Sequence, residues 1–211
     1  MLKNKKILIT SGPTWVPIDA MRVISNRSTG ELGHILTRSL QDKGARITLV
    51  EGPVTHRAEL KSIEVIKFHF YDELRKILRR ELKKPYDAVI HLAAVSDYQL
   101  KKVHTTKLRS DLSDLTLHLV PTKKLIGEIK KLNPNALLVG FKLESNISEK
   151  KLKEKASKLF WNAYCDLVVA NCLDGKKYAA YIFDRSENIL ARGNARGEIA
   201  KKLTQILDQR L

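Results

Sequence analysis

Five consecutive hydrogen-bonding side chains precede the first expected helix, and they are Ser25, Asn26, Arg27, Ser28 and Thr29. Gly30 and Gly33 follow, so a ligand or a strand can approach the first turn of that helix closely. The free N–H groups and the dipole of a helix N-terminus attract anions. We therefore expect residues 25–33 to contact a phosphorylated substrate. The alternative is an ordinary loop with Ser28 or Thr29 as the N-cap.

A second stretch with chemical potential is residues 95–111, which are polar and aperiodic and include five basic residues. Such a segment is typical of an arm or flap that closes over a charged substrate. Lys107 lies in this arm. Taken alone, Lys107 is more simply interpreted as a solvated surface lysine.

Hydrophobic periodicity predicts the elements that position these residues. Strands are expected at 7–10, 46–50, 63–68, 87–93, 115–120, 136–141 and 166–170, helices at 31–43, 72–82, 123–132, 148–161 and 195–209, and a β-hairpin at 178–190. Alternation of this kind predicts one α/β domain, residues 1–211, with a mainly parallel sheet, helices on both faces, a basic flap and a hairpin.

Ligands of parallel sheets bind beyond the carboxyl ends of the strands. The segments that follow the expected strands there are polar, and they are residues 11–26, 94–107, 142–146 and 171–174. We expect these segments to converge on one edge of the sheet.

Composition favours anionic partners, because the formal net charge is +16. No apolar run approaches the roughly 20 residues of a membrane span, and residues 1–6 lead directly into a strand without a signal-peptide pattern. Cys165 and Cys172 flank an expected strand too long for a disulfide. We expect reduced thiols, a cytoplasmic location and no metal site.

Several common site motifs are missing from the sequence. There is no P-loop, HExxH or CxxC, and no glycine fingerprint follows the first strand. Tyr98 and Lys102 fit the YxxxK spacing of short-chain reductases, but they follow a strand directly. A short-chain NAD(P)-dependent oxidoreductase remains an alternative because HLAAVS resembles a strand end of extended reductases. A nucleic-acid binder is a weaker alternative, since only 6% of residues are aromatic and no recognition motif is present.

Four segments together resemble the phosphopantothenoylcysteine synthetase family of the bacterial type. They are residues 7–33, HLAAVSDY at 91–98 followed by Lys107, LVGFKLES at 138–145, and DLVVAN at 166–171. The resemblance spans nearly the whole chain. It implies a Rossmann-like three-layer fold and a homodimer in which the arm or the hairpin crosses to the partner.

The resemblance also implies a ligase reaction of coenzyme A biosynthesis. A nucleoside triphosphate with Mg²⁺ activates the carboxylate of 4'-phosphopantothenate as an acyl-nucleotide, which releases pyrophosphate, and L-cysteine then forms the amide. The GPTxxPID form of the first loop favours CTP over ATP. The flavin-dependent decarboxylase domain is absent from the sequence, so we expect no flavin.

Site roles follow from the same resemblance. Asn26 is expected to bind the acyl carbonyl and Lys107 the triphosphate, with Ser28, Gly30 and Gly33 beside phosphate. Nucleotide-binding positions are expected at Ala93, Asp97, Lys123, Lys124, Leu125, Ile126, Phe141 and Lys158. The sequence departs from the family pattern at Leu108-Arg109-Ser110, where further lysines are usual, and at Cys172, where an aspartate is usual.

Overall fold

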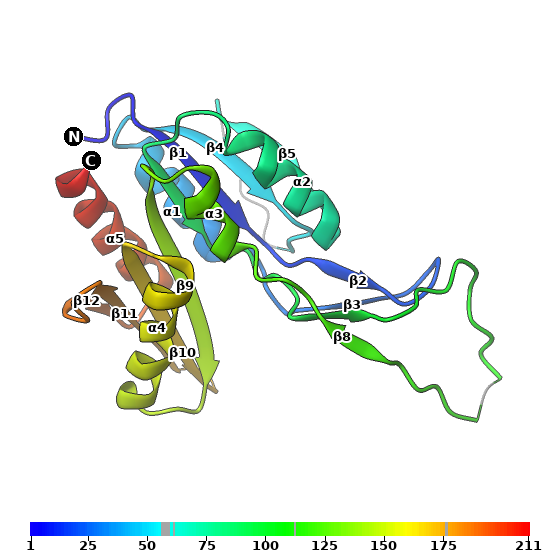
Figure 1. The fold of residues 1–211 in the computed structure, drawn as a ribbon. Helices are drawn as coiled ribbons and strands as arrows, with labels where there is room; N and C mark the ends of the chain where they lie inside the picture. Colours follow the sequence, from blue (N-terminus) through cyan, green and yellow to red (C-terminus); the bar gives the residue numbers. More distant parts are fainter. Residues whose placement is uncertain (56–59, 61, 112, 176) are drawn as a thin grey trace.

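A computed structural model describes residues 1–55, 60, 62–111, 113–175 and 177–211. Its centre is an eight-stranded sheet in the order β12-β11-β10-β9-β6-β1-β4-β5 (Figure 1). The strands are β1 (Lys6–Ser11), β4 (Arg46–Glu51), β5 (Glu64–Lys67), β6 (Ala88–His91), β9 (Leu137–Ser145), β10 (Leu167–Asp174), β11 (Lys177–Asp184) and β12 (Ile189–Gly193). The strands from β5 to β10 are parallel, whereas β11 and β12 form the expected antiparallel hairpin.

Helices cover both faces of this sheet. α1 (Glu31–Gln41) and α5 (Arg196–Arg210) pack side by side on one face, while α2 (Tyr71–Glu81), α3 (Ile126–Leu132) and α4 (Glu149–Ala163) lie on the other (Figure 1). The α/β three-layer fold expected from the sequence is therefore confirmed.

Alternation along β1 explains why both faces are covered. Ile7 and Ile9 join the hydrophobic cluster under α1 and α5, and Leu8 between them joins the cluster under α2, α3 and α4. All three side chains are fully buried. A strand that is apolar on both sides is stable only when both faces are shielded from water.

An arm leaves the body at the carboxyl ends of β1 and β6 (Figure 1). It consists of two antiparallel ribbons, β2 (Trp15–Pro17) with β3 (Val23–Ser25) and β7 (Tyr98–Leu100) with β8 (Leu119–Pro121). Residues 11–26, expected only as a polar segment after the first strand, therefore contain two short strands. The strand expected at 115–120 was misplaced, because β8 begins at Leu119 and pairs with β7 outside the central sheet.

Some element boundaries differ from the sequence expectations. α1 begins after Gly30, whose φ is 82°, so neither Ser28 nor Thr29 is its N-cap. α3 begins at Ile126, and residues 123–125 form the turn before it. β9 and β10 continue to Ser145 and Asp174, so the polar segments 142–146 and 171–174 lie largely within strands.

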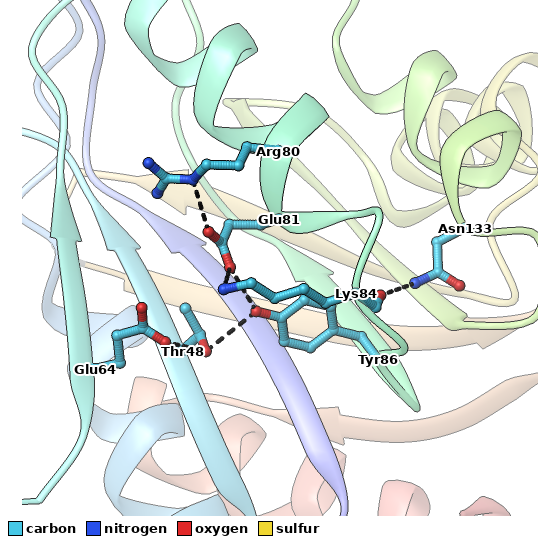
Figure 2. A network of polar contacts seen from close by, with 7 residues as sticks. All are labelled: Thr48, Glu64, Arg80, Glu81, Lys84, Tyr86 and Asn133. Atoms are coloured by element: carbon cyan, nitrogen blue, oxygen red, sulfur yellow. Dashed lines mark hydrogen bonds and ion pairs between the residues drawn. The ribbon is translucent and has the colours of Figure 1, made fainter.

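A polar network fastens α2 to the sheet at the end where the strands begin (Figure 2). The carboxylate of Glu81 is buried, and it accepts hydrogen bonds from Arg80 Nε at 3.0 Å and Lys84 Nζ at 2.6 Å. The Tyr86 hydroxyl lies 3.0 Å from Glu81 Oε2 and 3.2 Å from Thr48 Oγ1. Because every partner is satisfied, this buried charge is compatible with a stable core.

Candidate functional site

The turn after β1 and the turn after β6 meet at the carboxyl edge of the sheet. Gly12 has a φ of 83° that glycine adopts without strain, and its carbonyl accepts the N–H of Ala94 at 2.9 Å. The N–H of Thr14 in turn reaches the carbonyl of Ala94 at 3.3 Å. Two of the four segments expected to converge are thus in direct contact.

Asn26 lies at this junction. Its Nδ2 atom donates a hydrogen bond to the carbonyl oxygen of Ala94 at 3.0 Å, and its side chain is exposed. The amide has a second hydrogen that this bond does not use. Asn26 can therefore hold its position on Ala94 and still donate to a ligand.

The N-terminus of α1 packs tightly against the end of β1. A Cβ atom at Gly33 would lie 2.1 Å from Ser11 Oγ, and one at Gly30 would lie 2.4 Å from Val54 Cγ1. Gly33 therefore allows close approach of a strand, one of the two alternatives that its spacing suggested. Of the neighbouring polar residues, Ser25 and Arg27 are exposed and Ser28 is half-buried.

Three buried polar atoms along this edge have no hydrogen-bond partner among the described residues. They are Ser11 Oγ, Asn171 Oδ1 and the hydroxyl of Tyr178. Buried polar groups without partners are rare in native proteins and commonly mark a missing ligand or water. These three side chains and that of Phe141 lie on the α1 face of the sheet. Each is two residues along its strand from a member of the hydrophobic cluster under α1 and α5, and alternate residues of a strand point to the same face.

Ser11 and Asn171 begin two of the polar segments that were expected at this edge, but neither was singled out as a site residue. Tyr178 was expected only as part of the β-hairpin. Tyr178 is further tied to α1 by Arg196, whose guanidinium carbon lies 5.3 Å above the tyrosine ring and which forms an ion pair with Glu31 at 3.4 Å. Burial raises the pKa of Tyr178 to about 12, so its hydroxyl remains a hydrogen-bond donor at neutral pH.

The opposite face of the edge carries the turn before α3. Asp97 and Lys124 form an ion pair across it, and the carbonyl of Lys123 accepts the Tyr71 hydroxyl at 2.9 Å. Leu125 is buried and Ile126 is half-buried. The structure thus brings Asp97 beside the residues 123–126 that the sequence assigned to the same nucleotide.

Ala93 is placed by a buried polar pair at the end of β6. Its N–H donates to Thr10 Oγ1 at 3.1 Å, and Thr10 Oγ1 lies 2.9 Å from His91 Nδ1. Thr10 Oγ1 thus links the backbone after β6 to the imidazole of His91. Burial lowers the pKa of His91 to about 4, so this imidazole is neutral at physiological pH.

Lys107 is exposed and is held through its neighbour, Leu108. The N–H of Leu108 donates to Asp19 Oδ2 at 3.0 Å, and its carbonyl accepts Arg22 Nη2 at 2.8 Å. Asp19 and Arg22 lie at the tip of the β2–β3 ribbon, whereas Asn26 lies at its base. Within one chain, Lys107 and Asn26 are therefore at opposite ends of this ribbon.

Lys158 lies on the helix that connects β9 with β10. It is exposed on α4, nine residues after the first residue of that helix, Glu149. At a rise of 1.5 Å per residue this places it about 14 Å from the helix start. Leu159, the next residue, lies close to Ile126, since a Cβ atom at Gly140 would lie 3.5 Å from Leu159 Cδ1 and 3.1 Å from Ile126 Cδ1.

The described residues hold no group of three or more histidine, cysteine, aspartate or glutamate side chains arranged for a metal ion. No helix there is long and apolar enough to span a bilayer. Cys165 and Cys172 are both free thiols.

Comparison with known proteins gives a consistent result. Residues 2–208 match the family model described as the DNA/pantothenate metabolism flavoprotein C-terminal domain. The coenzyme A biosynthesis bifunctional protein CoaBC of Thermococcus kodakarensis is 37% identical over 179 residues, which are 82% of this chain and 42% of that protein. The CoaBC protein of Borreliella burgdorferi is 31% identical over 98% of this chain and 53% of that protein. The chain thus spans about half the length of these curated relatives.

Solved structures agree with the fold. The DNA/pantothenate metabolism flavoprotein of Streptococcus pneumoniae superposes with a TM-score of 0.88 at 26% identity and covers 98% of this chain and 100% of that one. A Cab2 mutant in complex with phosphopantothenate-cysteine superposes with a TM-score of 0.76 at 17% identity, over 99% of this chain and 90% of that one. At that identity the second likeness bears on the fold alone.

Proposed function

The chain belongs to the DNA/pantothenate metabolism flavoprotein C-terminal domain family, and from this premise we propose that it is a ligase of coenzyme A biosynthesis. It joins 4'-phosphopantothenate and L-cysteine through an acyl-nucleotide, with release of pyrophosphate and a nucleoside monophosphate. Residues 1–211 act as a single domain in this proposal.

One observation carries the proposal: the Asn26 amide, the Ala94 turn and the N-terminus of α1 gather at one edge of the sheet. Partnerless polar atoms of Ser11, Asn171 and Tyr178 lie along the same edge. A reaction with two anionic substrates needs such an edge, because helix N-terminal N–H groups and hydroxyl donors stabilise phosphate charge.

The first step is activation of the substrate carboxylate. A carboxylate oxygen attacks the α-phosphorus of the nucleotide, and the bond to the bridging oxygen of pyrophosphate breaks. Lys107 neutralises the charge that develops on the phosphates, and Ser28 with the first turn of α1 binds phosphate oxygens. Mg²⁺ enters as part of the nucleotide complex, because this ion is usually held largely by substrate phosphates and water.

The second step forms the amide. The cysteine nitrogen attacks the acyl carbon, the nucleoside monophosphate leaves, and the nitrogen loses its proton. Asn26 donates its second amide hydrogen to the acyl oxygen, where negative charge accumulates in the transition state. The bond from Asn26 to Ala94 fixes the amide before the substrate arrives, so little reorganisation is needed at the moment of reaction.

We assign the nucleotide to the surfaces on both sides of β6. Ala93, Asp97 and residues 123–126 contact it on one side, and Phe141 forms a wall on the other. Lys158 completes the set that family resemblance suggests. CTP is favoured over ATP on the form of the first loop, residues 12–19.

A homodimer completes the site in this proposal. Several exposed apolar side chains line the arm, namely Met21, Val23, Ile24, Tyr98, Val103, Leu115 and Leu119. A row of this size on a projecting ribbon is typical of an interface. Since Lys107 and Asn26 of one chain lie at opposite ends of the ribbon, a crossing arm brings Lys107 to the Asn26 of the partner subunit.

The test is direct. The purified chain, given 4'-phosphopantothenate, L-cysteine and Mg²⁺–CTP, is expected to release one pyrophosphate for each amide formed. Stabilisation by NADH or NADPH without pyrophosphate release would favour the reductase alternative instead.

The free thiols Cys165 and Cys172 support a reducing compartment such as the cytoplasm. Besides the second copy of the chain, the proposed partners are small molecules.

A further inference from the structure

A second cavity opens where β4 and β5 end. Its volume is about 600 Å³, and its lining comprises His34, Glu51, Gly52, Pro53, Val54, Leu60, Val65, Lys67, Phe68 and His69. Val54 forms the wall towards the candidate site, since Cβ atoms at Gly12 and Gly30 would lie 2.7 and 2.4 Å from its Cγ1 atom. The cavity therefore adjoins the candidate site, with the Val54 side chain between them.

A buried carboxylate faces this cavity. Glu51 is the last residue of β4, and its side chain is only 5% exposed. One oxygen meets Nε2 of the buried His34, and the other meets Nζ of Lys67, whose side chain is 62% exposed. Burial raises the pKa of Glu51, but the hydrogen bonds from His34 and Lys67 outweigh burial and hold the pKa below its usual value. The outer oxygen thus carries a negative charge whose partner is a flexible, solvent-facing ammonium.

The position of Glu51 in the sheet has a chemical meaning. The parallel strands lie side by side in the order β5-β4-β1-β6-β9-β10. Numbered by their sequence among the parallel strands, this is the order 3-2-1-4-5-6 of dinucleotide-binding folds. In those folds a carboxylate at the end of the second strand accepts a ribose hydroxyl, or a nearby arginine accommodates the 2'-phosphate of NADP. Glu51 ends the second strand here, and Lys67 ends the third.

The remaining lining suits a flat heterocycle. Val54 and Val65 present an apolar surface to the cavity, and Val65 is 39% exposed although it is hydrophobic, whereas Phe68 lies behind them and is buried. Burying such a surface against an aromatic ring is favourable.

We propose that this cavity binds the nucleoside part of an adenosine nucleotide, at a site separate from the one that carries out ligation. The purine packs on Val54 and Val65, and a ribose hydroxyl donates to Glu51. Lys67 leaves Glu51 and turns to the nucleotide phosphate. This inference goes beyond the proposed ligase activity and does not depend on it.

AMP is the probe that tests the site, with binding measured by calorimetry on the full chain. We expect one AMP per chain, and at least about tenfold weaker binding of 2',3'-dideoxy-AMP, because a hydrogen bond to a charged acceptor is lost. Glu51→Gln is expected to weaken AMP to a similar degree. Glu64→Gln is the matched control, since Glu64 lies on β5 but does not line the cavity.

A second variant keeps the test decisive if Glu51→Gln fails to fold. Val65→Trp fills the apolar surface without touching Glu51, and it should abolish AMP binding while Lys107→Gln leaves binding unchanged. Absence of AMP binding at millimolar concentration, equal binding of dideoxy-AMP, or loss of AMP binding in Lys107→Gln would each overturn the proposal. The last outcome would place AMP in the ligation site instead.

Discussion

Asp19 and Leu108 are 89 residues apart in sequence, yet Asp19 Oδ2 accepts the backbone N–H of Leu108 at 3.0 Å. Arg22, which donates to Asp19 through Nε at 2.9 Å, also donates to the Leu108 carbonyl at 2.8 Å. One carboxylate thus fixes the tip of the β2–β3 ribbon and the segment that carries Lys107. The position of Lys107 depends on this group more than on any contact of its own side chain.

Asp19→Asn is expected to release the arm without unfolding the body. The amide replaces one acceptor oxygen by a donor, so the N–H groups of Leu108 or Met21 lose a partner. Trypsin should cleave within residues 101–109 faster, and pyrophosphate release should fall. Asp111→Asn is the control, because Asp111 pairs only locally with Arg109 on the exposed arm. Equal cleavage rates in the two variants would contradict the anchoring role.

The pH dependence of this anchor follows from the same contacts. The N–H of Leu108 is the largest of the hydrogen bonds that hold the pKa of Asp19 well below its usual value. A lowered folded-state pKa adds stability that is present above the unfolded pKa, about 4, and is lost as pH falls through the folded value. The difference in unfolding free energy between wild type and Asp19→Asn should be constant from pH 7 to 5 and shrink only below pH 4.

Lys107→Gln should impair activation and not the later step. Loss of one charge that stabilises a developing anion typically lowers the rate on the order of a hundredfold. Pyrophosphate release in a single turnover should fall by that factor, whereas amide formation from a preformed acyl-nucleotide should be nearly unchanged. Lys102→Gln, an exposed lysine of the same arm, should behave as wild type. Undiminished release in Lys107→Gln would show that the triphosphate lies elsewhere.

The choice of nucleotide can be measured in the same assay. With 4'-phosphopantothenate in excess, CTP is expected to give faster single-turnover pyrophosphate release than ATP. Faster release with ATP would reverse this assignment while leaving the ligase reaction intact.

The arm predicts an assembly state. Light scattering should give a mass twice the 24.0 kDa of one chain. Ile24→Asp introduces a charge into the exposed apolar row of the arm and should shift the mass towards the monomer, since an unpaired charge in an interface is costly. Glu154→Gln, an exposed change on α4, should not. A monomeric wild type would remove the composite site.

The network of Figure 2 predicts a stability effect far from the site. Glu81→Gln should lower the free energy of unfolding in urea by about 1–3 kcal/mol, because Arg80 and Lys84 lose their charged acceptor. Hydrogen bonds from Lys84, Tyr86 and Arg80 outweigh burial and lower the pKa of Glu81, so its contribution should persist at neutral pH and disappear in acid. Pyrophosphate release at 25 °C should be unaffected.

Much of the body could be predicted from the sequence, because its strands are apolar runs and its helices have clear periodicity. Ser148 illustrates this: a helix was expected from residue 148, and the Ser148 hydroxyl caps α4 by accepting the N–H of Lys151 at 3.4 Å. The arm could not be predicted in the same way. β2, β3 and β7 have three residues each, too few for alternation to be visible, and β7 pairs with a strand about twenty residues away.

The site was predictable only in part, for a related reason. The contact of Asn26 with Ala94 follows from two turns meeting at one edge, which topology predicts. Ser11 and Asn171 lie in segments that were expected at this edge, but they and Tyr178 were not singled out. What distinguishes all three is a buried polar atom without a hydrogen-bond partner among the described residues. Glu51 likewise could not be distinguished from an ordinary strand end in the sequence, because its ion pairs with His34 and Lys67 depend on the fold.

The arm contributes nothing to the two hydrophobic clusters of the body: among the described residues, neither cluster includes any from 15–25 or 98–121. Substitutions along the ribbons should therefore change the free energy of unfolding of the three-layer body only slightly. Substitutions in the arm can therefore change the dimer interface and the choice of nucleoside triphosphate while the three-layer body stays the same. A chimera with the arm of a relative should accordingly show that relative's dimer pairing and nucleotide choice.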